Sequence, residues 1–368
     1  MGTASSRSAI TERCHARVGL MGNPSDGFEG KTLSFLIGNF AAVVTVEENG
    51  GNSGMEIVRN PRLDPLCFED VGAFVEHTRA NGYYGGMRLV QAACMVFATR
   101  CVQAGHGAVL TSRGGFRISY DTDIPRCVGL SGSSALIIAT FRALMRFYTL
   151  DLAALQILPS ELPTLMLDVE RKELGISAGL QDRVIQVFGG LVHMDFSGGP
   201  TGPLGLTGGV YSPVDPALLP PLYLAYNTRV GGDSGTVHST VKERWARRDP
   251  ELVAGMQALG GYADEALGAL QRGDAHALAS LMDRNFSMRR ALYGDVIVGE
   301  KNILMVQMAQ GMGLAAKFTG SGGALVCMRQ DGLGWLEQAR EEAVRAAFSE
   351  QGFVLVRVQL PPPPAPVS

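Results

Sequence analysis

A loop of small residues, Gly129-Leu130-Ser131-Gly132-Ser133-Ser134, is followed without a break by an apolar run that begins at Ala135. The run repeats apolar side chains at the spacing of one helix face, so we expect a helix from Ala135 with Ser133 or Ser134 as its N-cap. Such a loop at a helix N-terminus presents free N–H groups and the positive end of the helix dipole, which together favour phosphate. The loop predicts a phosphate site, and an ordinary capped loop is the alternative.

Two carboxylates, Glu170 and Asp182, stand on neighbouring predicted helices at 162–174 and 181–188. Each alone is typical of a surface acid or a helix-start acid. Together with the serine loop they match the needs of phosphoryl transfer, which uses Mg²⁺ held by a hydroxyl and a carboxylate. A second carboxylate can orient or deprotonate the attacking hydroxyl. The combination predicts a kinase.

A turn-forming segment, Asn23-Pro24-Ser25-Asp26, follows a short strand expected at 16–21. The later Gly30-Lys31-Thr32 suggests a P-loop, but Ser25 stands where that motif requires its first glycine. Residues 33–46 are also typical of a strand, where a P-loop requires a helix. We interpret Asn23 and Asp26 as polar groups offered from a loop at a strand end, with a plain turn as the alternative.

The remaining pattern predicts an α+β fold, in which helices pack on one side of an antiparallel sheet in each half of the chain. A Gly/Pro-rich span at 197–221 separates the halves. We therefore expect an N-terminal ATP-binding domain at 14–205, a C-terminal domain at 206–360 and a disordered, proline-rich tail at 361–368. Other expected elements are helices at 71–80, 87–104, 251–272, 275–290, 299–311 and 336–349, and strands at 108–111, 116–120, 222–227, 324–328 and 353–360.

The composition argues against several classes of protein. The 368 residues are 46% hydrophobic and 18% charged, which is typical of a globular chain with two domains. A net charge of -3 and the lack of basic runs interleaved with aromatics argue against a nucleic-acid partner. The six cysteines form no CxxC pair, which argues against a zinc site or a disulfide framework and indicates reduced thiols. No apolar run is suited to span a membrane, so we expect a cytoplasmic protein.

Three stretches, RVGLMGNPSD at 17–26, PRCVGLSGSSA at 125–135 and FTGSGGA at 318–324, resemble the three motifs of the GHMP kinases. This family contains galactose, homoserine, mevalonate and phosphomevalonate kinases. Further segments, such as GYYGGMRL, ELGISAGLQDRVIQVFGGL and RNFSMRRALYGD, are closest to its plant-type glucuronokinase branch, and the likeness extends over residues 14–360. The resemblance implies an N-terminal domain like ribosomal S5 domain 2 and a ferredoxin-like C-terminal domain.

The resemblance also implies a role for each motif. The first motif contacts the sugar, the second binds the ATP phosphates, and the third closes over the reaction centre. The implied residues are Asp182 as catalytic base with Arg17 beside it; Gly129, Leu130, Ser131, Gly132, Ser133, Ser134 and Ala135 for ATP; Ser134 and Glu170 for Mg²⁺; and Asn23, Asp26, Gly320, Ser321, Gly322 and Gly323 for the substrate. The implied reaction phosphorylates the anomeric hydroxyl of D-glucuronate, which feeds UDP-glucuronate synthesis. Another sugar-1-kinase, for galacturonate, arabinose or galactose, and a non-catalytic nucleotide sensor are the alternatives.

Two departures from the family pattern affect these roles. The phosphate loop is one residue longer than the usual GLGSSA, so Ser133 and Ser134 both stay open as the metal ligand. Asn23-Pro24-Ser25-Asp26 replaces the Glu-His-Thr-Asp of galactokinases, so the sugar contacts should differ. A uronate also needs a cation for its carboxylate, ideally a bidentate arginine. The candidates are Arg229, Arg289, Arg290 and Lys242.

Overall fold

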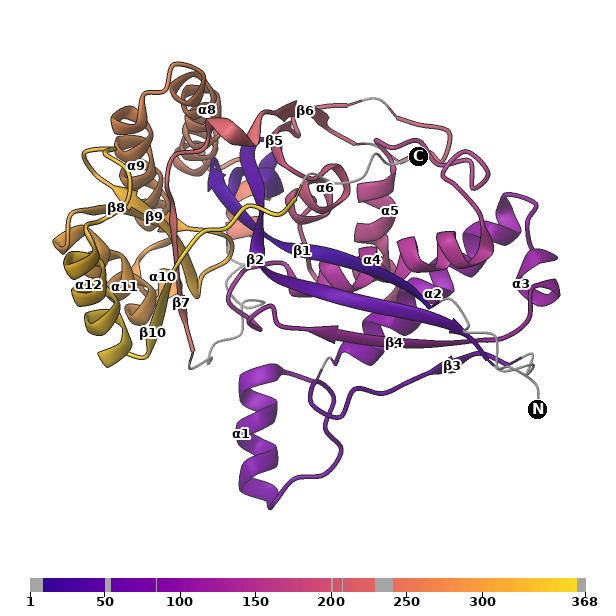
Figure 1. Cartoon of the computed structure of the whole chain (residues 1–368). Coiled ribbons are helices and arrows are strands. Elements are labelled where there is room, and N and C mark those ends of the chain that lie inside the picture. The colour runs from indigo at the N-terminus through magenta and orange to yellow at the C-terminus, as the bar shows by residue number, and fades with distance from the viewer. Residues whose placement is uncertain are drawn as a thin grey trace.

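The computed structural model describes residues 9–49, 54–83, 85–199, 201–206, 208–228 and 241–362. Within this part of the chain the strands form two sheets, and helices pack against both (Figure 1). The first sheet belongs to the N-terminal half and the second to the C-terminal half. The expected α+β fold is confirmed. Arg229, one of the candidate cations for the substrate carboxylate, lies outside the described residues.

The first sheet is built around one long strand, β2 (Lys31–Glu48), which pairs antiparallel with three others. Its strands are ordered β3-β4-β2-β5-β6, and β1 also pairs with β2. The other strands are β1 (Ile10–Met21), β3 (Glu56–Ile57), β4 (Phe116–Thr122), β5 (Leu191–Asp195) and β6 (Val210–Val214). The first motif lies at the end of β1 and in the short helix η1 (Ser25–Phe28), so the sheet fixes its position.

The glycine- and serine-rich loop is positioned by a buried helix, α4 (Gly132–Tyr148). Leu136, Ile137 and Phe141 are each at most 4% exposed, and burial of such side chains contributes about 1.5–3 kcal/mol apiece. The helix packs against β1 and β2 and against α2 (Gly86–Gln103). It begins at Gly132, three residues earlier than expected, and its N-cap is Ser131. The prediction of Ser133 or Ser134 as N-cap is therefore wrong, because these small residues join the first helical turn.

Three short elements that follow one another in the sequence include the two that carry Glu170 and Asp182. Helix α5 (Leu162–Asp168) continues into a π-helical turn, η2 (Val169–Glu173), and α6 (Gln181–Phe188) follows. The bounds of α6 are those expected from the sequence. Helix α1 (Val71–Asn81) projects from the body of the molecule in Figure 1.

The second sheet is antiparallel, in the order β10-β7-β9-β8. Its strands are β7 (Tyr223–Asn227), β8 (Leu314–Phe318), β9 (Ala324–Arg329) and β10 (Phe353–Arg357). The helices of this half are α8 (Pro250–Gln271), α9 (Ala275–Tyr293), α10 (Asp295–Val298), α11 (Glu300–Gly311) and α12 (Gln338–Glu350). In Figure 1 these elements, coloured orange to yellow, lie beside the N-terminal half.

Several expected elements differ in the structure. Residues 109–112 form a short helix, α3 (Val109–Ser112), and β4 pairs with β2, so the expected hairpin of 108–111 with 116–120 is wrong. β1 begins at Ile10, six residues before the strand expected at 16–21, and β6 lies within the Gly/Pro-rich span expected to separate the halves. The predicted domain boundary after residue 205 precedes β6, and the division at that residue stays a prediction. No helix in the described ranges is long and apolar enough to cross a membrane.

Candidate active site

The guanidinium of Arg17 joins three stretches that lie far apart in the sequence. Its Nε and Nη2 atoms donate to Oδ1 of Asp182 at 2.8 and 2.6 Å. Its Nη1 atom donates to the carbonyl oxygens of Gly129, at 2.7 Å, and Thr319, at 3.0 Å. Arg17 is only 5% exposed, so these bonds are shielded from water. One buried side chain of β1 therefore holds together the phosphate loop, the first turn of α6 and the glycine loop of the C-terminal half.

The two glycine-rich loops meet backbone to backbone. A Cβ atom added at Gly320 would lie 2.7 Å from the carbonyl oxygen of Gly129, and one added at Gly323 would lie 2.8 Å from the Cα of Val128. Gly129 has φ +70°, Gly322 has φ +142° and Gly323 has φ +82°, which favour glycine. The loop at residues 320–323 thus packs against the start of the phosphate loop, while its closure over the reaction centre stays a prediction.

The end of the phosphate loop carries a strained serine. Ser131 has φ +65°, which is uncommon for a residue other than glycine, and it is 8% exposed. Its Oγ atom is buried without a hydrogen-bond partner, while its carbonyl accepts bonds from Ser134 Oγ, at 3.2 Å, and Gln186 Nε2, at 3.0 Å. The side chain of Ser131 makes no capping bond to the first N–H groups of α4. An orphaned hydroxyl beside these groups fits a site for an anion or for a metal–phosphate ligand.

Asp182 lies in the first turn of α6, with its side chain 23% exposed. Its Oδ1 atom accepts both bonds from Arg17, whereas among the described residues Oδ2 has only a 3.5 Å contact with Arg183 Nη1. One carboxylate oxygen is thus fixed in place, and the other is more weakly held. An accessible, oriented carboxylate can accept a proton, which is the role predicted for Asp182.

Glu170, the predicted metal ligand, forms a buried ion pair with Arg183. Burial lowers the pKa of Arg183 to about 9, and the positive charge of Arg17 acts in the same direction. Arg183 and Gln186 stand three residues apart, so they lie on one face of α6. The first contacts Glu170 and the second contacts the carbonyl of Ser131, so this face of α6 connects Glu170 with the phosphate loop.

These residues fit a magnesium ion that enters with a nucleotide, because Mg²⁺ needs few protein ligands when phosphates supply the others. Ser131 offers an unpartnered hydroxyl, and Ser134 keeps lone pairs because its hydroxyl donates to Ser131. Glu170 is paired with Arg183 and would share its charge between the guanidinium and a metal. Among the described residues, no group of three or more His, Cys, Asp or Glu side chains is arranged so that it could hold a metal ion by itself.

Asp26 lies in η1, and its Oδ2 atom would be only 2.8 Å from a Cβ atom added at Gly179. The loop before α6 therefore runs directly against this carboxylate. The pKa of Asp26 is raised to about 7, first by burial and then by the charge of Asp182, while the charge of Arg17 acts in the opposite direction. Asp26 and Asp182, predicted for sugar binding and for base catalysis, thus lie in one electrostatic environment.

The side chain of Asn23, predicted to bind substrate, is engaged within the protein. It is 3% exposed, and its Oδ1 atom accepts a 2.6 Å bond from Lys317 Nζ. Lys317 also donates to the carbonyls of Gly19 and Phe318, and burial holds its pKa well below the usual value. Asn285 on α9 completes this contact by bonding the backbone of residues 22 and 23. Lys317 and Asn285 were not predicted, since only distant segments reveal their role.

The four candidate cations for the substrate carboxylate are in different surroundings. Arg289 is 4% exposed and donates to the carbonyls of Gly320, at 2.5 Å, and Ser321, at 2.8 Å. Arg290 pairs with Asp295, whose side chain is 59% exposed. Lys242 is exposed and donates to Ser177 Oγ at 2.7 Å. Arg289 is therefore the candidate that the structure brings to the predicted reaction loop, and Arg229 lies outside the described residues.

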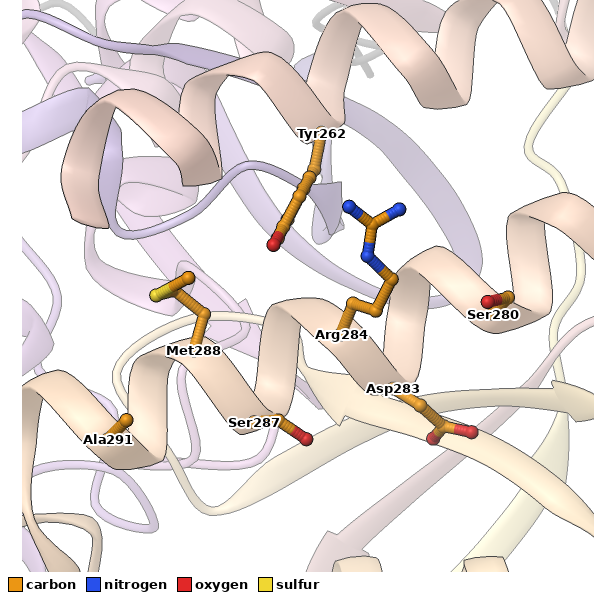
Figure 2. A pocket seen from close by; sticks show the side chains of 7 residues that line it. All are labelled: Tyr262, Ser280, Asp283, Arg284, Ser287, Met288 and Ala291. Atoms are coloured by element: carbon orange, nitrogen blue, oxygen red, sulfur yellow. The ribbon is translucent and has the colours of Figure 1, made fainter. Parts of the chain in front are cut away.

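A surface hollow of about 510 Å³ lies between α8 and α9 and is separate from this cluster. Figure 2 shows Tyr262 reaching from α8 toward α9, where Arg284 and Met288 reach back toward it. Arg284 stacks on Tyr262 with its Cζ atom 4.5 Å from the ring centroid. Asn285 and Arg289 instead contact the first motif and the glycine loop. The hollow holds none of the predicted site residues.

Comparisons of the sequence with known proteins identify a family domain and two plant relatives. Residues 89–190 match the GHMP kinases N terminal domain. The chain is 42% identical over 351 residues to glucuronokinase 1 of Arabidopsis thaliana, covering 95% of this chain and 93% of that protein. It is also 42% identical over 350 residues to probable glucuronokinase 2 of the same plant, covering 95% and 92%.

Solved structures share the fold at low sequence identity. L. major mevalonate kinase in complex with R-mevalonate has a TM-score of 0.66, 17% identity and 98% coverage of both chains. Lactococcus lactis galactokinase complexed with galactose has a TM-score of 0.68 and 15% identity, covering 96% of this chain and 94% of that one. The identity to the plant proteins over nearly the whole chain shows that this protein belongs to the GHMP kinase family, in the group that contains the Arabidopsis glucuronokinases.

Proposed function

We propose that this protein transfers the γ-phosphoryl group of ATP to the anomeric hydroxyl of D-glucuronate and releases D-glucuronate 1-phosphate. The proposal rests first on the plant relatives, which are named glucuronokinases. The observation that carries it in the structure is the guanidinium of Arg17, which bonds Asp182, Gly129 and Thr319 at once. Phosphoryl transfer depends on positioning and on charge stabilisation. This arrangement supports both, because one buried cation holds a carboxylate, a phosphate loop and a covering loop together.

Each group has a distinct task in the proposed reaction. Asp182 Oδ2 accepts the proton of the anomeric hydroxyl, while Arg17 holds the other carboxylate oxygen in place. The N-terminal amides of α4 bind the phosphates of ATP, and Asp26 bonds hydroxyls of the sugar. Glu170 and a serine of the phosphate loop would hold a Mg²⁺ ion that enters with ATP, and the ion would supply charge neutralisation for the phosphates. Catalysis then depends mainly on positioning and charge stabilisation.

An ADP-release assay over a panel of sugars and sugar acids tests the proposal. We expect turnover on D-glucuronate, dependence on added Mg²⁺, and a phosphorus NMR signal of a phosphate on the anomeric carbon. Turnover on galactose, galacturonate, arabinose or mevalonate without turnover on glucuronate would contradict the proposed substrate. Phosphate on another hydroxyl would contradict the proposed position of the sugar.

We further propose a cytoplasmic location. Cys14, Cys67, Cys94, Cys101 and Cys327 form no disulfide bond among the described residues, and reduced thiols are typical of a reducing compartment. Cell fractionation with an antibody to the protein measures the location directly, and recovery in an oxidising compartment would contradict it.

A further inference from the structure

Two polar atoms on adjacent turns of α9 are buried without partners. These are Nε of Arg289 and the hydroxyl of Tyr293, and neither has a hydrogen-bond partner in the part of the chain that the structure describes. The two residues are 4% and 6% exposed, so both atoms are shielded from bulk solvent. They are four residues apart, and Arg289 Cζ lies 5.4 Å from the centroid of the Tyr293 ring. Buried donors in native proteins are nearly always bonded, so this pair calls for a ligand.

The charge around Arg289 supports an anionic ligand. Its guanidinium donates to the carbonyls of Gly320 and Ser321, and no carboxylate pairs with it among the described residues. Lys317, also fully buried, bonds two carbonyls and an amide oxygen. Of the acids nearby, Asp182 is bonded by Arg17 and Glu170 by Arg183, and Asp26, whose charge acts on Arg289, forms no ion pair with it among the described residues. Buried cations are stable when they are paired, so this region favours an incoming negative charge.

The pair lies beside the loop that is predicted to close over the sugar-acid substrate. Arg289 stacks on Phe318, at 4.9 Å, and holds the loop that Arg17 connects to Asp182. Burial raises the pKa of Tyr293 to about 12, and the charges of Asp26 and Arg289 both act on this hydroxyl. The predicted sugar-binding acid and the two unpartnered donors therefore share one region.

We propose that Arg289 and Tyr293 bind the carboxylate of the sugar acid, Arg289 through its unpartnered Nε–H and Tyr293 through its hydroxyl. This assignment rests on the proposed function and explains how a uronate is preferred over a sugar with a neutral C6 hydroxymethyl group. Arg290 is already paired with Asp295, and Lys242 is an exposed residue bonded to Ser177. Arg289 combines burial, lack of an acidic partner and an unused donor.

The test compares D-glucuronate with D-glucose, which differs at C6, in the wild type and in Tyr293→Phe. The lost hydroxyl has no partner in the described protein, so the variant should fold with unchanged stability. We expect the KM for glucuronate to rise about 10-fold or more, since bonds to charged groups are strong, with KM for ATP unchanged. The Kd of glucose, measured by calorimetry, should not change. Arg289→Lys should raise the glucuronate KM further and reduce the preference for glucuronate over glucose.

Matched controls separate substrate binding from a structural role. Tyr223→Phe removes a hydroxyl that bonds Glu341 and the amide of Leu336, and Arg100→Lys alters a buried arginine that bonds the carbonyl of Leu155. Both should lower stability and leave the glucuronate KM unchanged. An unchanged glucuronate KM in Tyr293→Phe, or equal changes for glucuronate and glucose, would overturn the assignment alone. A wild type without turnover on glucuronate would overturn the proposed function as well.

Discussion

Replacing Gly320 by alanine should disable catalysis while leaving the fold intact. The added Cβ atom would lie 2.7 Å from the carbonyl oxygen of Gly129 and 3.0 and 3.1 Å from the two terminal nitrogens of Arg17. Ordinary contact begins near 3.4 Å, so the carbonyl or the guanidinium must move by about 0.7 Å. Such a shift disturbs the bonds from Arg17 to Asp182. A misplacement of about 1 Å costs roughly 100-fold in rate, so we expect kcat to fall about 10- to 100-fold.

The assay is ADP release at saturating substrates, with urea unfolding as a check on folding. Overpacking of this kind costs about 1–3 kcal/mol, which is below the total stability of a typical domain. Gly261→Ala is the matched control, because a Cβ atom added there meets nothing within 4 Å and alanine favours the helix α8. A folded Gly320→Ala variant that keeps kcat within about twofold would refute the link between the glycine contact and catalysis.

Three further predictions follow from single contacts. Asp182→Asn should abolish turnover but keep ATP affinity in calorimetry; retained turnover would contradict its role as base. The folded-state pKa of Asp26, about 7, lies above the ordinary 3.8, so the folded protein keeps a proton that the unfolded chain loses. Stability therefore falls as pH rises from 4 to 7, by at most about 1.4 kcal/mol per unit, and Asp26→Asn should remove this slope in urea unfolding at several pH values. Asn285→Ala leaves the amide of Gly22 and the carbonyl of Asn23 unpaired, so we expect a loss of about 2–4 kcal/mol in the free energy of unfolding; a loss below about 0.5 would contradict this.

Local sequence patterns predicted α6 well because its ends carry strong local signals. The helix stops at Gly189, whose φ of +76° suits glycine. Its apolar residues recur at the spacing of one helix face. The segment 109–112 was mispredicted because Val109 and Leu110 fit a strand as well as a helix, and only the pairing of β4 with β2 decides between them. Strand β8 was missed because its short apolar run follows directly on a helix.

The predicted site residues were found by motif, but their contacts depend on chain segments that meet only after folding. Asp182 and Arg17 are 165 residues apart in sequence, and Lys317 and Asn23 are 294 apart. No local pattern specifies such pairs. Arg183 shows the same limit, because its partner Glu170 lies on another element and its burial comes from tertiary packing. Tyr293 stood in a segment noted for its resemblance, and its lack of a partner is visible only in three dimensions.

The close approach of the glycine loops decides where this protein can be redesigned. At Gly320 and Gly323 any side chain would press on main-chain atoms, which cannot move aside as a flexible side chain can. Laboratory evolution toward other sugar acids should therefore leave those positions unaltered and diversify the inward face of α9. A library built on that helix should keep Asn285 and the bonds of Arg289 to the glycine loop and should vary Tyr293, so that substrate preference changes while the glycine loops stay in place.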